Sequence, residues 1–108
     1  MITPSTDPLS WLQEYYLSLC DGDWEHHYGF KIDNLDNPGW LVSFDLRDTP
    51  MEGVGFESIH FQRSEHDWVI CKVDEKVFRG TGGPGNLVEL VIIFRDWVAF
   101  QSAGQIKG

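Results

Sequence analysis

The spacing of hydrophobic residues changes twice along this chain, and that change constrains the fold more than any other feature. Between residues 8 and 20 they recur at helical intervals, at Leu9, Leu12, Tyr16 and Leu19. From residue 28 the period becomes two, with Tyr28, Phe30 and Ile32 alternating with polar residues or glycine. Near the C-terminus the helical interval returns. A helix, a run of strands with one buried face and a second helix are therefore predicted.

Capping residues set the expected ends of both helices. Asp7 followed by Pro8 is a typical helix start, and Gly22 is a suitable stop after a helix over about 8–20. Asn86 and Glu89 match a capping box at the start of a helix that runs to about residue 99. Val88, Ile92 and Ile93 would also suit a strand, but the cap and the length favour the helix.

The central region reads as antiparallel strands joined by turns. Asn37-Pro38-Gly39-Trp40 predicts a hairpin turn in which Gly39 supplies a positive φ. The returning strand should turn Trp40, Val42, Phe44 and Leu46 toward the core. A third strand is expected around Ile59 and Phe61 and a fourth over 68–73, with Val77 and Phe78 extending it or forming a short edge.

These elements predict an α+β fold: an antiparallel sheet of about four strands, with the N-terminal and C-terminal helices packed on one face. A length of 108 residues with 42% hydrophobic content suits one domain, over 1–108. No apolar run is long enough to span a bilayer, and the first residues lack the pattern of a signal peptide, so a cytoplasmic protein is expected. Cys20 and Cys71 are then expected as free thiols.

Charge narrows the choice of partners. The chain has 17 acids and 8 bases, a net charge of −9, which disfavours nucleic acid and anionic membranes. Ten acids and two bases fall in residues 1–54 (net −8), against seven acids and six bases in 55–108 (net −1). This asymmetry is either a solvated face or a surface that captures a basic protein.

The densest group of ionisable residues lies at 20–29, CDGDWEHHYG. Asp21, Asp23, Glu25 and His26 could form a metal site or a small metal-dependent hydrolase centre, although their spacing does not match a calcium loop. Zinc binding by Cys20 with both histidines is disfavoured, because adjacent histidines in an extended chain point to opposite faces. We expect one of His26 and His27 to face inward and the other to be solvated.

Two other features have a structural and a functional interpretation. Residues 80–85, GTGGPG, match G-x-G-x-x-G, but the parallel strand of a dinucleotide fold is missing after the following helix, so a flexible strand-to-helix connection is predicted. Of the five tryptophans, Trp24 alone sits among acids. It could close one end of the core or anchor a protein interface.

Several motifs together resemble the immunity protein 53 family of bacterial polymorphic toxin systems. They are Trp11-Leu12 and Tyr15-Tyr16, the run from Cys20 to His26 with Tyr28-Gly29, the turn 35–40 (LDNPGW), Asp45-Leu46, Thr49, Asp67-Trp68 and the helix from Asn86 to Trp97. The resemblance covers nearly the whole chain.

The resemblance implies a single-domain cytoplasmic antidote that binds a cognate toxin domain and blocks its active site or an essential surface. It implies no catalysis and no cofactor. The toxin would be basic, with a nuclease as one option by analogy, and a monomer is the favoured oligomeric state. The predicted leading contacts are Asp21, Asp23, Trp24 and Glu25, and the secondary ones are Asp33, Asp36, Asp45 and Asp48.

Overall fold

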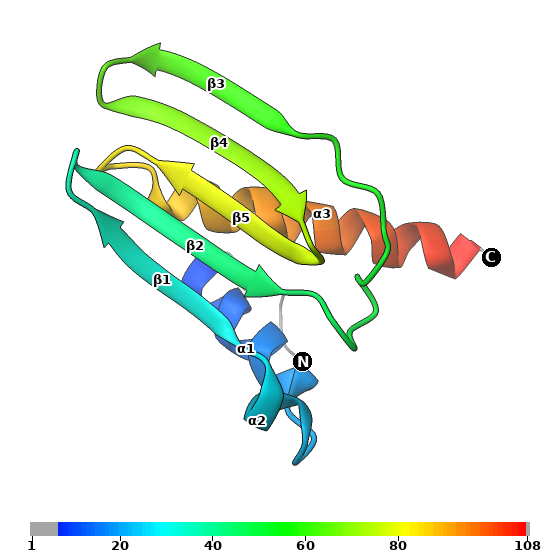
Figure 1. The fold of residues 1–108 in the computed structure, drawn as a ribbon. Helices are drawn as coiled ribbons and strands as arrows, with labels where there is room; N and C mark the ends of the chain where they lie inside the picture. Colours follow the sequence, from blue (N-terminus) through cyan, green and yellow to red (C-terminus); the bar gives the residue numbers. More distant parts are fainter. Residues whose placement is uncertain (1–6, 108) are drawn as a thin grey trace.

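The computed structural model describes residues 7–107, with side chains described as far as residue 101. Three helices and five strands follow one another in chain order (Figure 1): α1 (Pro8–Leu19), α2 (Trp24–His27), β1 (Phe30–Leu35), β2 (Gly39–Asp45), β3 (Ile59–Ser64), β4 (Asp67–Asp74), β5 (Val77–Gly82) and α3 (Leu87–Lys107). The first helix starts as predicted, because the backbone N–H of Leu9 donates to the Asp7 carboxylate at 3.1 Å.

The five strands form one antiparallel sheet in the order β1-β2-β5-β4-β3. Both long helices cover the same face of this sheet, which leaves the other face without a helix (Figure 1). The α+β prediction is thus confirmed, with five strands instead of about four. The extra strand, β5, is central and not an edge: its residues pair with β2 on one side and β4 on the other.

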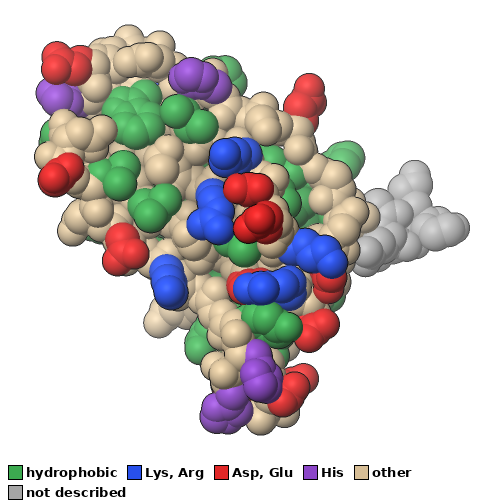
Figure 2. All heavy atoms as spheres, in the orientation of Figure 1, with side chains coloured by type: hydrophobic (Ala, Val, Ile, Leu, Met, Phe, Trp, Pro, Cys, Tyr) green, Lys and Arg blue, Asp and Glu red, His purple; other side chains and the backbone are tan. Residues whose placement is uncertain are grey.

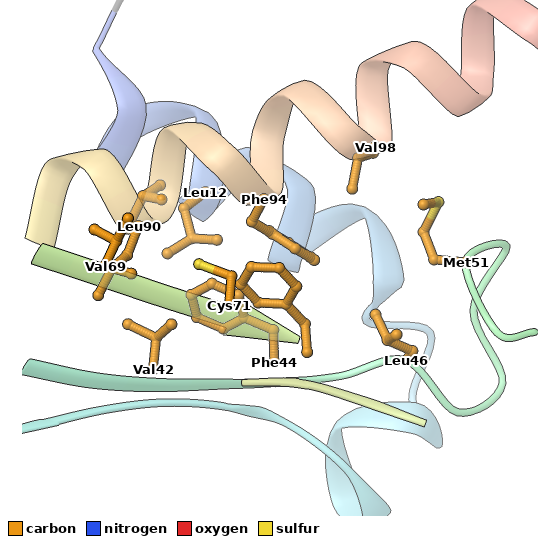
Figure 3. Close-up of a cluster of buried hydrophobic side chains, with 12 residues drawn as sticks. Leu12, Val42, Phe44, Leu46, Met51, Val69, Cys71, Leu90, Phe94 and Val98 are labelled. Carbon is orange, nitrogen blue, oxygen red and sulfur yellow. The ribbon is translucent and has the colours of Figure 1, made fainter. Parts of the chain in front are cut away.

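The core lies between the sheet and the helices, and Phe94 of α3 is at its centre (Figure 3). The Phe94 ring centroid lies 4.7 Å from that of Phe44 and 5.0 Å from that of Phe78. Val42, Phe44 and Leu46 are buried as the alternating pattern predicted. The two helices meet through aromatic contacts, such as that of Trp11 with Phe94 at 5.9 Å between centroids.

The prediction that residues 80–85 form a flexible connection is wrong for the first part of this segment. Its glycines are needed there because neighbouring elements pack closely against the backbone. Gly80 and Gly82 belong to β5, and a Cβ on Gly80 would lie 3.1 Å from Leu90 of α3. A Cβ on Gly83 would overlap the backbone carbonyl of His66. Absent side chains therefore let α3 and the β3–β4 turn approach the central strand.

Gly83→Ala is expected to destabilise the fold by about 1–3 kcal/mol, because the new methyl group must displace backbone atoms. Gly85→Ala is the matched control, since a Cβ there meets nothing within 4 Å and φ is not positive. Urea unfolding of both variants measures the difference. Equal free energies of unfolding would show that the close approach at Gly83 is wrong.

Two predicted local motifs are wrong in detail. Gly39 has no positive φ: the Asn37–Pro38 bond is cis, and glycine is required because a Cβ would overlap the carbonyl of Gly82. Asn86 and Glu89 do not form the expected capping box. The Asn86 side chain instead accepts from the backbone N–H of Trp68 (3.3 Å) and donates to Asp67 and Glu89 (both 3.0 Å), joining α3 to β4.

Two element boundaries also differ from the prediction. The first strand begins at Phe30 and not at Tyr28, because residues 24–27 form the short helix α2. The last helix continues to Lys107, eight residues beyond the predicted end near residue 99. Among the described residues, no helix combines the length and the apolar character that crossing a membrane requires.

Candidate functional site

The carboxylates of Asp21 and Glu25 are used inside the α1–α2 junction. The backbone N–H groups of Asp23 and Trp24 both donate to Asp21 Oδ1 at 2.9 Å. The N–H groups of Asp21 and Gly22 donate to the two oxygens of Glu25 at 3.0 and 2.9 Å. The bonds from Trp24 and Asp23 lower the pKa of Asp21, so this carboxylate stays charged and keeps the turn closed.

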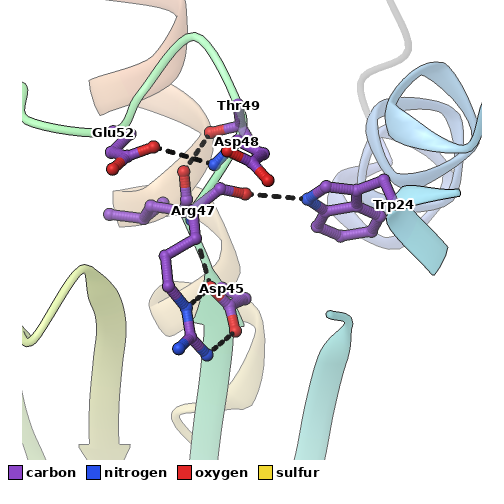
Figure 4. Close-up of polar contacts among 7 residues, drawn as sticks. Trp24, Asp45, Arg47, Asp48, Thr49 and Glu52 are labelled. Atoms are coloured by element: carbon purple, nitrogen blue, oxygen red, sulfur yellow. Dashed lines mark hydrogen bonds and ion pairs between the residues drawn. The ribbon is translucent and has the colours of Figure 1, made fainter. Parts of the chain in front are cut away.

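Trp24 faces the interior and not the surface. Its side chain is 3% exposed, and its indole N–H donates to the backbone carbonyl of Arg47 at 2.9 Å (Figure 4). Its ring also packs against Tyr16 and Phe30, at 6.1 and 5.9 Å between centroids. Of the two interpretations of Trp24, the geometry supports the one in which it closes one end of the core.

The geometry does not support the alternative of a metal-dependent centre at residues 20–29. Over the described range, 7–107, no three His, Cys, Asp or Glu side chains come together in a way that could hold a metal ion. The expectation of one inward histidine is wrong, because α2 leaves both His26 and His27 exposed. His27 Nε2 lies 3.4 Å from Asp23 Oδ1 at the surface.

The cysteines also offer little chemistry. Both are free thiols, and Cys71 is completely buried in the core. Burial raises the pKa of the Cys71 thiol to about 12, so it is protonated at neutral pH and a poor nucleophile. Cys20 donates its S–H to the carbonyl of Tyr16 at 3.3 Å, at the end of α1.

Asp45 is held in a bidentate ion pair at the end of β2 and is not a free surface acid. Arg47 Nε and Nη2 donate to its two oxygens at 2.9 and 2.6 Å, and the guanidinium lies 4.8 Å from the centre of the Tyr28 ring (Figure 4 shows the pair). Burial raises the pKa of Asp45, but the bonds from Arg47 outweigh it and leave the pKa below its usual value. The same pair raises the pKa of Arg47.

The remaining predicted acids, Asp23, Asp33, Asp36 and Asp48, are all exposed, but they form two groups. The bond from Trp24 to Arg47 joins α2 to the segment after β2, so Asp23 and Asp48 belong to the same end of the sheet. Asp33 and Asp36 lie toward the opposite end, where β1 turns into β2. The structure therefore does not gather the predicted acids into one patch.

The helix-free face carries a feature that sequence reasoning missed. A hollow of about 410 Å³ lies over β1, β2 and β5, and its lining includes Lys31, Arg79, Arg47, Tyr28 and Ser43. Figure 2 views this face and shows Lys and Arg side chains gathered over the middle of the sheet, with acids among and around them. The alternation within each strand could have indicated that these side chains point away from the core. The strand order that brings them side by side was not predictable from the sequence.

Taken together, the fold and the site define a small α+β domain whose charged side chains close turns, form ion pairs or line an open face of the sheet. The chain belongs to the immunity protein 53 family, whose model matches residues 9–99. This confirms the resemblance drawn from the motifs and establishes an immunity function in general terms. Neither the comparison with curated proteins nor that with solved structures returned a match.

Proposed function

We propose that this protein neutralises a cognate toxin domain by binding it, without catalysis of its own. Membership of an immunity protein family is the observation that carries the proposal. In the family's biology, as the motif resemblance implies, the toxin is encoded beside its antidote. The protein acts in the cytoplasm, where the antidote meets the toxin.

Electrostatic attraction brings the two proteins together in this proposal. The net charge is −9, and the carboxylates of Asp23, Asp33, Asp36 and Asp48 lie within 4 Å of no Lys or Arg nitrogen in the described chain. Exposed carboxylates that no Lys or Arg neutralises create a field that steers an oppositely charged partner and raises the association rate. A basic toxin fits this field.

A charge-matched pair of variants tests the steering. Asp23, Asp33, Asp36 and Asp48 are changed to Asn in one variant, and Glu14, Glu57, Glu65 and Glu75 are changed to Gln in the control. Both sets are exposed and both raise the net charge by four. The first variant should associate with the toxin domain roughly tenfold more slowly at low salt, with a weaker salt dependence, and the control should change the rate much less.

Stopped-flow binding at several salt concentrations gives both quantities. Asp21 and Glu25 stay unchanged in these variants, because their loss would open the α1–α2 junction. Equal slowing by the two variants would mean that only the overall charge matters. No slowing by either, together with a rate independent of salt, would refute electrostatic steering.

A further inference from the structure

Among the side chains that the structure describes, three basic ones lack an ion pair. Four of the Lys and Arg side chains that the structure describes contact carboxylates within 4 Å: Arg47, Arg63, Lys76 and Arg95. The other three, Lys31, Lys72 and Arg79, do not. They lie in one row across the sheet, since the registers pair Lys31 with Ser43, Ser43 with Arg79, and Arg79 with Lys72. We call these three residues the cationic row.

The cationic row is on the helix-free face. Within each strand its members alternate with core residues: Lys31 follows Phe30, Arg79 follows Phe78, and Lys72 follows Cys71. Successive side chains of a strand point to opposite faces of the sheet. The row therefore faces away from α1 and α3, where a large partner can reach it.

The row places two like charges opposite each other in the sheet. Lys72 and Arg79 are directly opposite each other on adjacent strands, and like charges in that position destabilise a sheet. The nearest acids neutralise the row only in part. Asp45 attracts Arg79, but its two oxygens are bonded to Arg47. Asp33 and Asp74, two residues beyond Lys31 and Lys72 in their strands, make no ion pair within 4 Å among the described side chains. The row is a positive strip that an external anionic group would neutralise.

The hollow lies at the Lys31 and Arg79 end of the row and adds neutral donors. Tyr28 and Ser43, which carry hydroxyl groups, line it beside these two cations and Arg47. The Asp45 carboxylate also lines the hollow, but its two oxygens accept from Arg47. The remaining cationic and hydroxyl side chains around this depression of about 410 Å³ suit a carboxylate or another oxyanion, which accepts several short hydrogen bonds.

The size of the row and the overall charge favour a protein segment over a free small anion. The row crosses four adjacent strands, so it extends over about 14 Å at a spacing of about 4.8 Å between strands. That length exceeds one oxyanion and matches several residues of extended chain. A net charge of −9 also repels small free anions, whereas a toxin surface with basic groups around an acidic segment brings compensating charge.

We propose that the helix-free face is the toxin-docking face and that an acidic segment of the toxin lies along the cationic row. This inference rests on the proposed function and makes it more specific. The surface would be complementary to a toxin in which basic groups border an acidic centre, because Asp23 and Asp48 lie at one end of the sheet and Asp33 and Asp36 toward the other. The overall negative charge of this protein predicts a basic partner. The acidic segment at the centre of the partner's surface is predicted only by the cationic row.

A charge-matched pair of double variants tests the docking face. Lys31→Gln with Arg79→Gln lowers the net charge by two at the row, and Gln13→Glu with Gln101→Glu lowers it by two on the helices that cover the opposite face. Titration calorimetry uses the full chain and a catalytically inactive form of the toxin domain encoded beside it. We expect at least tenfold weaker binding by the row variant and less than threefold weakening by the control.

Folding is measured separately, so that loss of affinity is not confused with loss of structure. Lys72→Gln relieves the repulsion with Arg79, and its melting temperature should be equal to or above that of the wild type. A lower melting temperature would show that the row stabilises the fold and would overturn the inference. Circular dichroism of the row variant checks that it is folded at the temperature of the titration.

The other outcomes separate this inference from the proposed function. Wild-type affinity in the row variant would overturn the docking face while toxin neutralisation stands. If the wild-type protein did not bind the toxin domain, both the docking face and the proposed toxin neutralisation would be refuted. In parallel, inorganic phosphate is titrated into the protein and the amide chemical shifts are followed. Saturable shifts confined to the cationic row, together with a row variant that binds the toxin as tightly as the wild type, would assign the hollow to a small oxyanion. That result would overturn docking at this face.

Discussion

Phe94→Ala is expected to lower the free energy of unfolding by about 3–5 kcal/mol. Phe94 is completely buried, and six aromatic rings lie within 6.3 Å of its ring, centroid to centroid: Trp11, Tyr15, Phe30, Phe44, Phe78 and Trp97. They come from both long helices and three strands, so the cavity would weaken every layer of the fold. A loss of this size is a large share of the roughly 5–15 kcal/mol that holds a domain together.

Phe100→Ala is the matched control, because it removes the same ring from the same helix at a position that is 76% exposed. Its effect should stay within about 0.5 kcal/mol. Urea unfolding followed by tryptophan fluorescence measures both variants. If Phe94→Ala cost less than about 1 kcal/mol, the aromatic cluster would not be the centre of the core.

Trp24→Ala is expected to cost a similar amount, about 3–5 kcal/mol, because Trp24 is a core residue of the junction and not a surface anchor. Trp24→Phe keeps an aromatic ring but leaves the Arg47 carbonyl without its indole donor, for an expected loss of about 1–3 kcal/mol. Thermal and urea unfolding of both variants give the comparison. A structural role for Trp24 predicts that the wild type is the most stable, Trp24→Phe is less stable and Trp24→Ala is the least stable.

His26→Ala serves as the control for Trp24, since it lies in the same short helix with its side chain exposed. Its stability should match that of the wild type within about 0.5 kcal/mol. A Trp24→Ala variant that unfolds like the wild type but no longer binds the toxin would contradict this account and restore Trp24 as an interface residue.

The fold was largely predictable because its outer elements follow local rules. The period of the hydrophobic residues defined α1, β2 and the start of α3. The central strand β5 was predicted only as an extension of the fourth strand or a short edge at Val77 and Phe78, because Gly80 and Gly82 have a low intrinsic preference for strands. These two glycines suit β5 because α3 packs closely against them and because β5 pairs with a strand on each side. Neither contact can be inferred from the neighbouring residues in the sequence.

Local motifs failed where distant residues decide the outcome. Pro38-Gly39 reads as a common turn, yet the requirement for glycine comes from Gly82, more than forty positions away. Asn86 reads as a helix cap, yet its side chain bonds to Asp67 and to the backbone of Trp68. Sequence spacing placed both motifs at element ends correctly and misassigned their partners.

In the candidate site, too, the sequence revealed local features and not those that depend on contacts between distant residues. The acids of residues 20–29 were conspicuous in the sequence, but Asp21 and Glu25 bond to the junction's own backbone. The cationic row was inconspicuous, because Lys31, Lys72 and Arg79 are spread over 49 positions and meet only through the strand order β1-β2-β5-β4. Net charge described the molecule as a whole and gave no indication that three basic residues align across the sheet.

Inhibition of the toxin at increasing amounts of this protein tests the central claim most directly. The toxin's activity is measured after incubation with the protein at fixed toxin concentration, over a range of molar ratios and times. A binder predicts that inhibition rises with the molar ratio, reaches its limit at a fixed ratio and does not increase with time once the complex has formed. Complete inactivation by a small fraction of one equivalent, progressing with time, would show that the protein modifies its toxin catalytically and would contradict the account.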